Sequence, residues 1–218
     1  MPLMSEPYIR AAGRVGGVAL YDRTIALTMR EERWRPVLRD RLLAQVPPNG
    51  TVVDLGAGTG TLAIALAEKR PDIKVIGVDG DPEILERARA KPGAEKVEWK
   101  EGLAGGLDLP DESVDGAVMS LVLHHLGPET KRKALKDVVR VLRPTAQLHV
   151  ADWGRPATPL LRAAFFALQV TDGFDNTRDH AEGRLPQILK EAGFASVTRY
   201  RRLPTGWGTL ELLAASRG

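Results

Sequence analysis

The hydrophobic residues of this chain follow two alternating patterns, which predict strands and helices in turn. Short apolar runs rich in β-branched residues are typical of buried parallel strands. Such runs, in one case strictly alternating, occupy residues 51–55, 74–79, 96–100, 114–121 and 147–152. Apolar residues spaced three and four apart predict amphipathic helices from residue 62, over 83–90 and over 129–142. Strands that alternate with helices predict a mostly parallel sheet covered on both faces.

The C-terminal third departs from this alternation. Residues 154–186 predict an apolar helix followed by a polar, turn-rich stretch over 171–180. A helix is then expected over 185–192, and strand-like runs at 196–200 and 209–215 predict a closing antiparallel pair. We therefore expect an insertion between the parallel strands and an antiparallel edge.

The N-terminal segment has no strand pattern. Residues 1–17 lack a clear period and predict a loosely docked arm, whereas residues 18–46 show helical spacing. Because Pro36 suits a first helical turn, we expect two helices with a boundary near residues 31–35. The chain is accordingly divided into two parts: an arm with cover helices, 1–46, and an α/β domain, 47–218.

Composition limits the classes of function. The chain has 218 residues, of which 43% are hydrophobic and 27% charged, enough for one well-buried domain. Lysine and arginine number 31 against 28 acidic residues and are interspersed with them, so no nucleic-acid partner is expected. Cysteine is absent, which excludes disulfides, thiolate metal sites and a cysteine nucleophile within these residues. No metal site is predicted.

Two observations bear on the compartment. No run of about 18 apolar residues appears, so a transmembrane helix is not expected. Glu6, Arg10 and Arg14 interrupt the apolar core that a secretory signal would need. We therefore expect a cytoplasmic protein.

A glycine turn follows the first predicted strand and points to a nucleoside ligand. The stretch Asp54-Leu55-Gly56-Ala57-Gly58-Thr59-Gly60 joins a strand to a helix, and its glycines let a ligand lie against bare backbone. Its third glycine comes one residue early for a dinucleotide site. Asp79 ends the second strand about twenty residues later, the spacing of a ribose-binding acid. The stretch resembles the first motif of class I S-adenosylmethionine (SAM) methyltransferases. The segments Tyr21-Asp22-Arg23 and Arg33-Trp34-Arg35 resemble the N-terminal helices of the ubiquinone and menaquinone biosynthesis methyltransferases.

The resemblance implies a fold, a cofactor and a binding site. It implies a three-layer, Rossmann-like α/β sandwich with a mostly parallel seven-stranded sheet and a C-terminal antiparallel pair. It implies SAM as cofactor and a small-molecule methyl acceptor, with the insertion at 154–186 as a substrate lid. The cofactor-binding residues it implies are Asp54, Gly56, Ala57, Gly58, Gly60, Asp79, Gly80, Leu103, Ala104, Ser120 and Leu121. Leu103 stands where the family carries an aspartate for the adenine amino group.

Two histidines and an aspartate are the candidates for a catalytic base. The stretch Leu123-His124-His125-Leu126 resembles that of small-molecule methyltransferases and not the Asn-Pro-Pro-Tyr/Phe motif of enzymes that methylate adenine or glutamine nitrogens. Adjacent residues do not share a face, so one of His124 and His125 is expected to face the cleft and the other solvent or packing. Asp152, at the end of the fifth strand, is the third candidate. Histidine is a suitable base near neutral pH.

Several side chains leave structural and functional roles open. Phe165, Phe166 and Phe174 line an acceptor pocket or fill core, and Tyr21 and Trp34 cover the cofactor or pack. The basic residues Lys131, Arg132, Lys133 and Lys136 predict a solvated helix face.

The favoured function is transfer of a methyl group from SAM to a small molecule. The alternatives are a SAM-binding protein without methyl transfer and a nucleotide-binding, Rossmann-like oxidoreductase.

Overall fold

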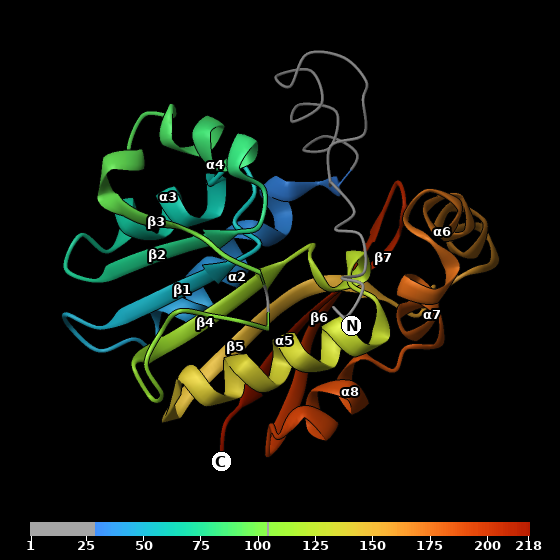
Figure 1. The fold of residues 1–218 in the computed structure, drawn as a ribbon. Coiled ribbons are helices and arrows are strands. Elements are labelled where there is room, and N and C mark those ends of the chain that lie inside the picture. Colours follow the sequence, from blue (N-terminus) through green and yellow to red (C-terminus); the bar gives the residue numbers. More distant parts are fainter. Residues whose placement is uncertain (1–28, 104) are drawn as a thin grey trace, which may run out of the picture.

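The computed structural model describes residues 29–103 and 105–218 and builds them around one sheet (Figure 1). The strands lie in the order β3-β2-β1-β4-β5-β7-β6. β1 to β5 pair in parallel, and β7 pairs antiparallel with both β5 and β6. Their bounds are β1 Thr51–Leu55, β2 Lys74–Asp79, β3 Val97–Glu101, β4 Val114–Ser120, β5 Leu142–Gly154, β6 Ser196–Thr205 and β7 Gly208–Ser216. The mostly parallel sheet with its C-terminal antiparallel pair is confirmed.

Helices cover both faces of the sheet. Their bounds are α2 Glu31–Leu43, α3 Thr61–Lys69, α4 Pro82–Arg89, α5 Pro128–Val141, α6 Pro159–Asp172, α7 Phe174–Glu182 and α8 Leu185–Ala192, with short 3₁₀ helices η1 Ala94–Lys96 and η2 Leu123–His125. Neighbouring strand residues enter opposite cores: Val52 packs with α2 and α3, and Val53 with α5 and α8. This period of two explains why continuous apolar runs form the central strands. The three-layer sandwich is thereby confirmed.

The topology places a switch point beside the glycine turn. β1 pairs with β2 on one side and with β4 on the other, so the chain leaves β1 between two diverging connections. Ligands of such sheets bind outside the carboxyl ends of the strands at this point. Asp81 begins α4 by accepting hydrogen bonds from the N–H groups of Glu83 and Ile84, as its position before Pro82 predicts.

Three expectations about local structure were wrong. α2 begins at Glu31, inside the predicted boundary at 31–35, but Pro36 lies within the helix and not in its first turn. The burial of Trp34 and Leu38 outweighs the backbone hydrogen bond that Pro36 cannot make. β5 begins at Leu142, directly after α5, and not at residue 147 as expected, because the residue before a proline is driven to extended backbone and Arg143 precedes Pro144.

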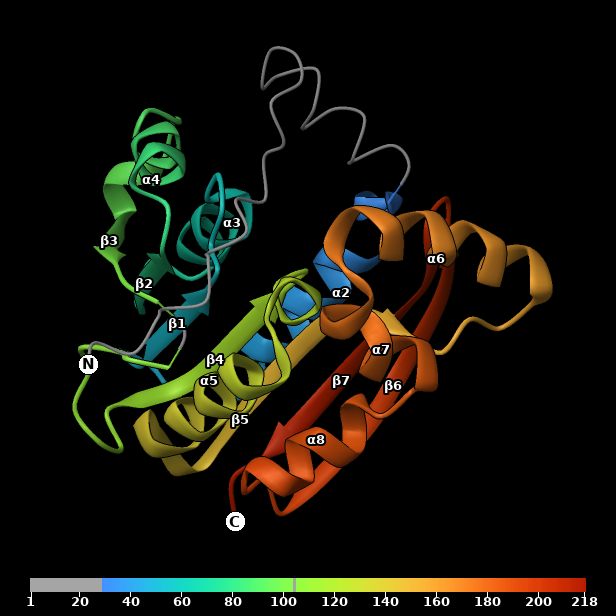
Figure 2. The ribbon, with the colours of Figure 1, turned by 45° about the vertical axis from the view of Figure 1, so that its right-hand side comes forward.

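The third wrong expectation concerns residues 171–180, which were expected to be turn-rich. Most of this stretch forms the helix α7, which buries Thr177 and His180. Figure 2 shows α6 and α7 beyond the end of β5, at one end of the sheet. The expected arm, residues 1–17, and Tyr21 lie outside the described residues. Among the helices of the described ranges, none is both long and apolar enough to cross a membrane.

Candidate functional site

The glycine turn between β1 and α3 leaves one bare position open. Gly56, Gly58 and Gly60 all have positive φ, at 70°, 55° and 77°, which glycine adopts without a Cβ clash. A Cβ on Gly56 would lie 2.3 Å from Val122 Cγ2, and one on Gly60 would lie 2.4 Å from the Trp99 ring. A Cβ on Gly58 would meet no heavy atom of the described residues within 4 Å. Packing therefore accounts for two glycines, and Gly58 alone faces open space.

Asp79 is fixed to the glycine turn by backbone donors. Its Oδ2 accepts from Gly58 N–H at 2.8 Å and its Oδ1 from Asp81 N–H at 3.0 Å. A carboxylate offers about four acceptor positions, enough for these bonds and for ribose hydroxyls. The N–H groups of Gly56 and Ala57 are bound to Val78 O. The N–H groups of Gly56, Ala57 and Gly58 thus already have acceptors, and this part of the turn contributes open space and a fixed acid.

Asp54 lies beneath this turn, away from solvent. It is 2% exposed, and burial raises the pKa of its carboxyl to about 7, with the charge of Asp79 acting in the same direction and Arg35 against it. The Ala63 N–H at the start of α3 favours the ionised form. A positively charged ligand above the turn would stabilise the Asp54 carboxylate.

The neighbouring strand ends supply the other predicted positions. Leu103 follows β3 and is 59% exposed, an apolar side chain next to Gly102, whose N–H donates to Asp79 O. Ser120 ends β4 half-buried, and Leu121 after it has φ 59°, a strained value for leucine. The bond from Leu121 N–H to Ala151 O holds that conformation. Gly80 is half-buried beside Asp79; Ala104 lies outside the described residues.

Asp152 and His124 form a buried pair at the end of β5. The carboxylate is fully buried and accepts from His124 Nδ1 at 2.8 Å, from Leu123 N–H at 2.8 Å and from Trp153 N–H at 2.7 Å. Burial acts to raise the pKa of Asp152, but His124, His180 and these donors outweigh it and hold the pKa well below its usual range. Because the carboxylate only accepts, the neutral form of His124 carries its proton on Nδ1 and its lone pair on Nε2.

The two adjacent histidines converge, contrary to expectation. The ring centroids of His124 and His125 are 4.0 Å apart, and ligand atoms of both lie within 4.8 Å of one another and of one from Asp172. The 3₁₀ geometry of η2 turns successive side chains by about 120°, so they do not point to opposite faces as in a strand. Burial lowers the pKa of His125 to about 3 and raises the pKa of Asp172, the last residue of α6.

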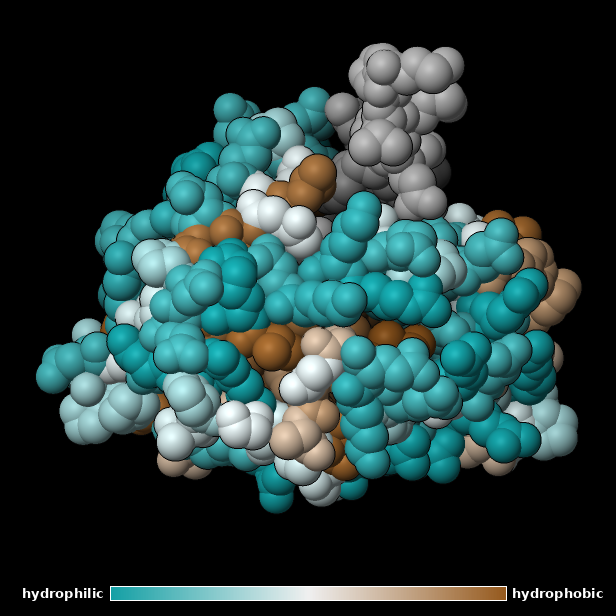
Figure 3. All heavy atoms as spheres, turned by 60° about the horizontal axis from the view of Figure 1, so that its bottom comes forward, coloured by the Kyte–Doolittle hydropathy of each residue, from teal (hydrophilic) through white to brown (hydrophobic). Residues whose placement is uncertain are grey.

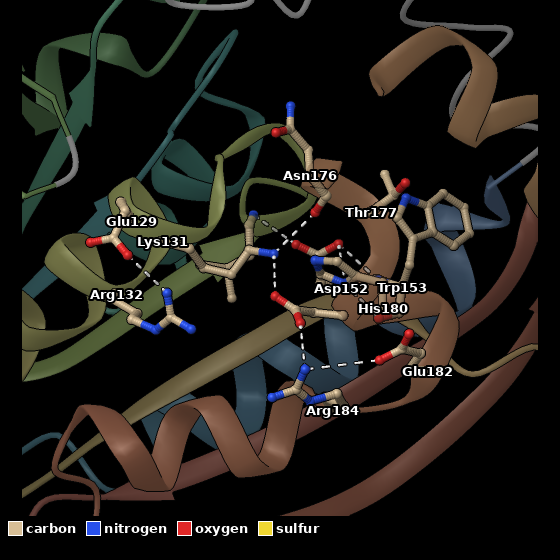
Figure 4. Close-up of polar contacts among 12 residues, drawn as sticks. Glu129, Lys131, Arg132, Asp152, Trp153, Asn176, Thr177, His180, Glu182 and Arg184 are labelled. Atoms are coloured by element: carbon tan, nitrogen blue, oxygen red, sulfur yellow. Dashed lines mark hydrogen bonds and ion pairs between the residues drawn. The ribbon is translucent and has the colours of Figure 1, made fainter. Parts of the chain in front are cut away.

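Lys131 was expected in solvent but is fully buried. Its Nζ donates to Asn176 O at 3.0 Å and lies 3.5 Å from Asp179 Oδ2, joining α5 to α7 (Figure 4). Burial lowers the pKa of its ammonium. A helical wheel cannot show that a neighbouring helix supplies acceptors for this position. His180 lies in the same close-up and donates from Nδ1 to Trp153 O at 2.8 Å.

Three buried ring nitrogens around this pair have no hydrogen-bond partner among the described residues. They are His125 Nδ1, Trp153 Nε1 and His180 Nε2. The rings of Trp153 and His180 lie 6.1 and 6.2 Å from that of His124. Buried polar atoms nearly always have a partner, so these three nitrogens are exceptions to a general rule.

The predicted apolar residues of the insertion divide between core and surface. Phe165 and Leu168 are buried, whereas Leu160, in the same predicted apolar helix, is exposed. Phe166 and Phe174 are also exposed, with ring centroids 5.6 Å apart. On the face shown in Figure 3, hydrophobic residues form separate patches within a largely hydrophilic surface.

Comparisons with known proteins agree with this geometry. A family model described as a methyltransferase domain matches residues 52–145, from β1 to the start of β5. Over these residues the chain resembles the class I SAM-dependent methyltransferases. It is 36% identical over 166 residues to an arsenite methyltransferase of Halobacterium salinarum, covering 72% of this chain and 40% of that protein.

Two further methyltransferases extend the comparison. A demethylmenaquinone methyltransferase of Deinococcus radiodurans is 32% identical over 148 residues, 67% of this chain and 59% of its own length. The chain thus spans about half the length of these curated relatives. The crystal structure of a SAM-dependent methyltransferase from Aquifex aeolicus shares the fold, with a TM-score of 0.59, 23% identity and coverage of 82% of this chain and 89% of that one.

SAM, the cofactor of this family, fits the residues at the methyltransferase switch point. Gly58 leaves open space, Asp79 presents a fixed acid, and Asp54 gains from a nearby positive charge. Sequence reasoning missed Asp172 and His180. The signal was present in the acid that ends the amphipathic α6 and in the helical spacing of Thr177 and His180, but the polar composition of 171–180 obscured it.

Proposed function

We propose that this chain transfers the methyl group of SAM to a small organic acceptor. The observation that carries the proposal is the bond from Gly58 N–H to Asp79 Oδ2, 2.8 Å long, at the switch point of the sheet. It holds a nucleoside-binding acid beside the one bare position of the turn. SAM supplies a methyl group already activated by its sulfonium. The protein has only to position, desolvate and, where the acceptor carries a proton, assist its removal.

The cofactor side of the site is proposed as follows. Gly58 and the neighbouring turn hold the methionine part of SAM, and the carboxylate of Asp54 stabilises the positive charge of SAM. Asp79, with Gly80, binds the ribose. The exposed Leu103 packs on the adenine ring, an apolar contact in place of the usual aspartate. Ser120 and Leu121 form the floor between the two ligands, in continuity with β4.

The acceptor side lies where η2 meets the insertion. Of the three base candidates, Asp152 already accepts hydrogen bonds from His124 and from two backbone N–H groups, so we assign it as a positioning residue. His124 is the candidate whose Nε2 lone pair points away from that carboxylate, toward Asp172 at 3.7 Å. We propose that His124 Nε2 is the atom through which the acceptor is engaged. Residues 154–186 serve as the lid, and residues 1–46 as the cover of the cofactor.

The two named relatives suggest different acceptors, and the composition favours one. Arsenite carries a soft arsenic centre that binds thiolates, and the chain has no cysteine to supply one. The acceptor region is instead bounded by aromatic and imidazole rings, Trp153, His124 and His180. An organic, ring-containing acceptor such as a demethylated quinol fits these surfaces.

A labelled-methyl assay tests this function. The 218-residue chain is incubated with methyl-labelled SAM and either a demethylated naphthoquinol, arsenite or a cell extract, and the products are separated and identified by mass. Labelled organic product supports the proposal. Label on arsenic, or no transfer to any acceptor despite SAM binding, would overturn the acceptor assignment or the transfer activity, respectively.

A further inference from the structure

Three side chains from two separate elements converge beside Asp152. His124 and His125 come from η2, and Asp172 ends α6 of the insertion. One ligand atom from each lies within 4.8 Å of the others, and His124 Nε2 is 3.7 Å from Asp172 Oδ2. Metal–ligand bonds of about 2.0–2.2 Å place neighbouring ligand atoms roughly 3–4 Å apart. The His124–Asp172 separation therefore already suits a shared cation.

The orientation of the His124 ring is set by a second group. Its Nδ1 donates to Asp152 at 2.8 Å, and that carboxylate is itself held by the N–H groups of Leu123 and Trp153. A carboxylate on the far nitrogen fixes the tautomer and raises the basicity of a metal-binding imidazole. The Nε2 lone pair is consequently directed at Asp172 before any ion arrives.

His125 provides an independent observation. Its Nδ1 is buried and has no hydrogen-bond partner among the described residues. An imidazole nitrogen left in this condition loses its interaction with water and gains none in return. A cation bound among the three side chains would give this ring an ion to coordinate.

We propose that His124, His125 and Asp172 form a binding site for a divalent transition-metal ion such as Zn²⁺. Two imidazoles and one carboxylate are a donor set typical of zinc sites that keep a coordination position for water or substrate. The ion would also join the core to the insertion, since its ligands lie on η2 and α6. This proposal does not depend on methyl transfer.

The ion would change how the acceptor is engaged. His124 Nε2 cannot hold a cation and accept a proton at the same time. With the ion bound, an acceptor oxygen would occupy its open position, and the cation would make the hydroxyl of that acceptor more acidic.

Equilibrium dialysis of the 218-residue chain against Zn²⁺, followed by metal analysis, tests the site. We expect one ion per chain, and we expect Co²⁺ at the same site to give visible absorption bands of a low-coordinate complex. Asp172→Asn and His125→Gln should each weaken Zn²⁺ binding by about tenfold or more. Asp175→Asn is the matched control, because Asp175 is an exposed acid three residues further on. Circular dichroism establishes that each variant is folded.

The outcomes separate this proposal from the proposed function. Stoichiometric binding that is lost in Asp172→Asn and His125→Gln but kept in Asp175→Asn supports the site. No binding, or equal binding by wild type and all variants, overturns it. SAM affinity is measured in parallel without metal, so a chain that binds SAM and transfers methyl but binds no Zn²⁺ refutes the metal site alone. A chain that binds Zn²⁺ but not SAM refutes the proposed function alone.

Discussion

Gly58 N–H donates to Asp79 Oδ2 over 2.8 Å, so the turn after β1 and the end of β2 form one rigid unit. The two residues are far apart in sequence, and parallel pairing of β1 with β2 brings them together. Because Gly58 faces open space and Asp79 is 7% exposed, a ligand at this point meets bare backbone and one fixed carboxylate. The cofactor assignment depends on this arrangement.

The turn glycines should respond differently to alanine. Gly58→Ala adds a methyl group where nothing is contacted, so stability should fall only by about 1–2 kcal/mol for the left-handed backbone, while SAM affinity falls by about tenfold or more. Gly56→Ala should cost more stability, because its Cβ would lie 2.3 Å from Val122. Thermal unfolding and SAM titration measure both effects. Equal loss of stability in the two variants would contradict the assignment.

Asp54 should make stability depend on pH. A folded-state pKa of about 7, raised from 3.8, means that the folded chain holds a proton which the unfolded chain releases between these values. This contribution is fully present below about pH 4 and is lost as pH rises to 7, at a slope of at most about 1.4 kcal/mol per pH unit. Asp54→Asn should remove that slope. Urea unfolding of both proteins from pH 5 to 8 measures it, and parallel curves would refute the prediction.

The positioning role of Asp152 predicts a split between turnover and cofactor binding. Asp152→Asn replaces one accepting oxygen with an NH2 donor, so the side chain can no longer accept from both His124 Nδ1 and Leu123 N–H. The orientation of His124 is then less well fixed, and the methyl-transfer rate should fall by about 10–100-fold. Affinity for SAM should stay the same, since Asp152 lies on the acceptor side. Transfer kinetics and SAM titration give the two numbers. Loss of SAM binding in a folded variant would place Asp152 in the cofactor site instead.

Lys131 should anchor the insertion. Lys131→Ala leaves Asp179 without its buried cation and opens a cavity, so we expect a loss of about 3 kcal/mol in unfolding free energy. Lys131→Met keeps the volume and should cost less. Lys136→Ala, on the exposed face of the same helix, serves as the control and should change stability by no more than about 0.5 kcal/mol. Urea unfolding ranks the three, and equal values for Lys131→Ala and Lys136→Ala would rule out the anchor.

The parallel sheet was predictable because its strands are buried on both faces. Runs such as Val52-Val53 leave no helical alternative between a turn and three glycines, and Asp81-Pro82 marks a helix start in any context. The sequence also allowed the cofactor-side residues Asp54, Gly58 and Asp79 to be predicted, because local turn chemistry and the register of the parallel strands bring them together.

The arrangement of the acceptor side could be predicted less well from the sequence. The helical pattern places Lys131 on the outer face of its helix, and only the position of α7 shows that it is buried. The 3₁₀ helix η2 brings His124 and His125 together, but three residues are too few to show its period in the sequence. Asp172 reaches them only through the packing of the insertion, which no local pattern encodes.

Titration calorimetry of SAM against wild type and Asp79→Asn tests the central claim most directly. Asp81→Asn is the matched control, because asparagine also caps a helix. We expect micromolar-range binding of SAM to wild type and to Asp81→Asn, with an order-of-magnitude loss of affinity or more in Asp79→Asn. Absence of SAM binding to the folded wild type, or unchanged affinity in Asp79→Asn, would contradict the assignment of the cofactor site.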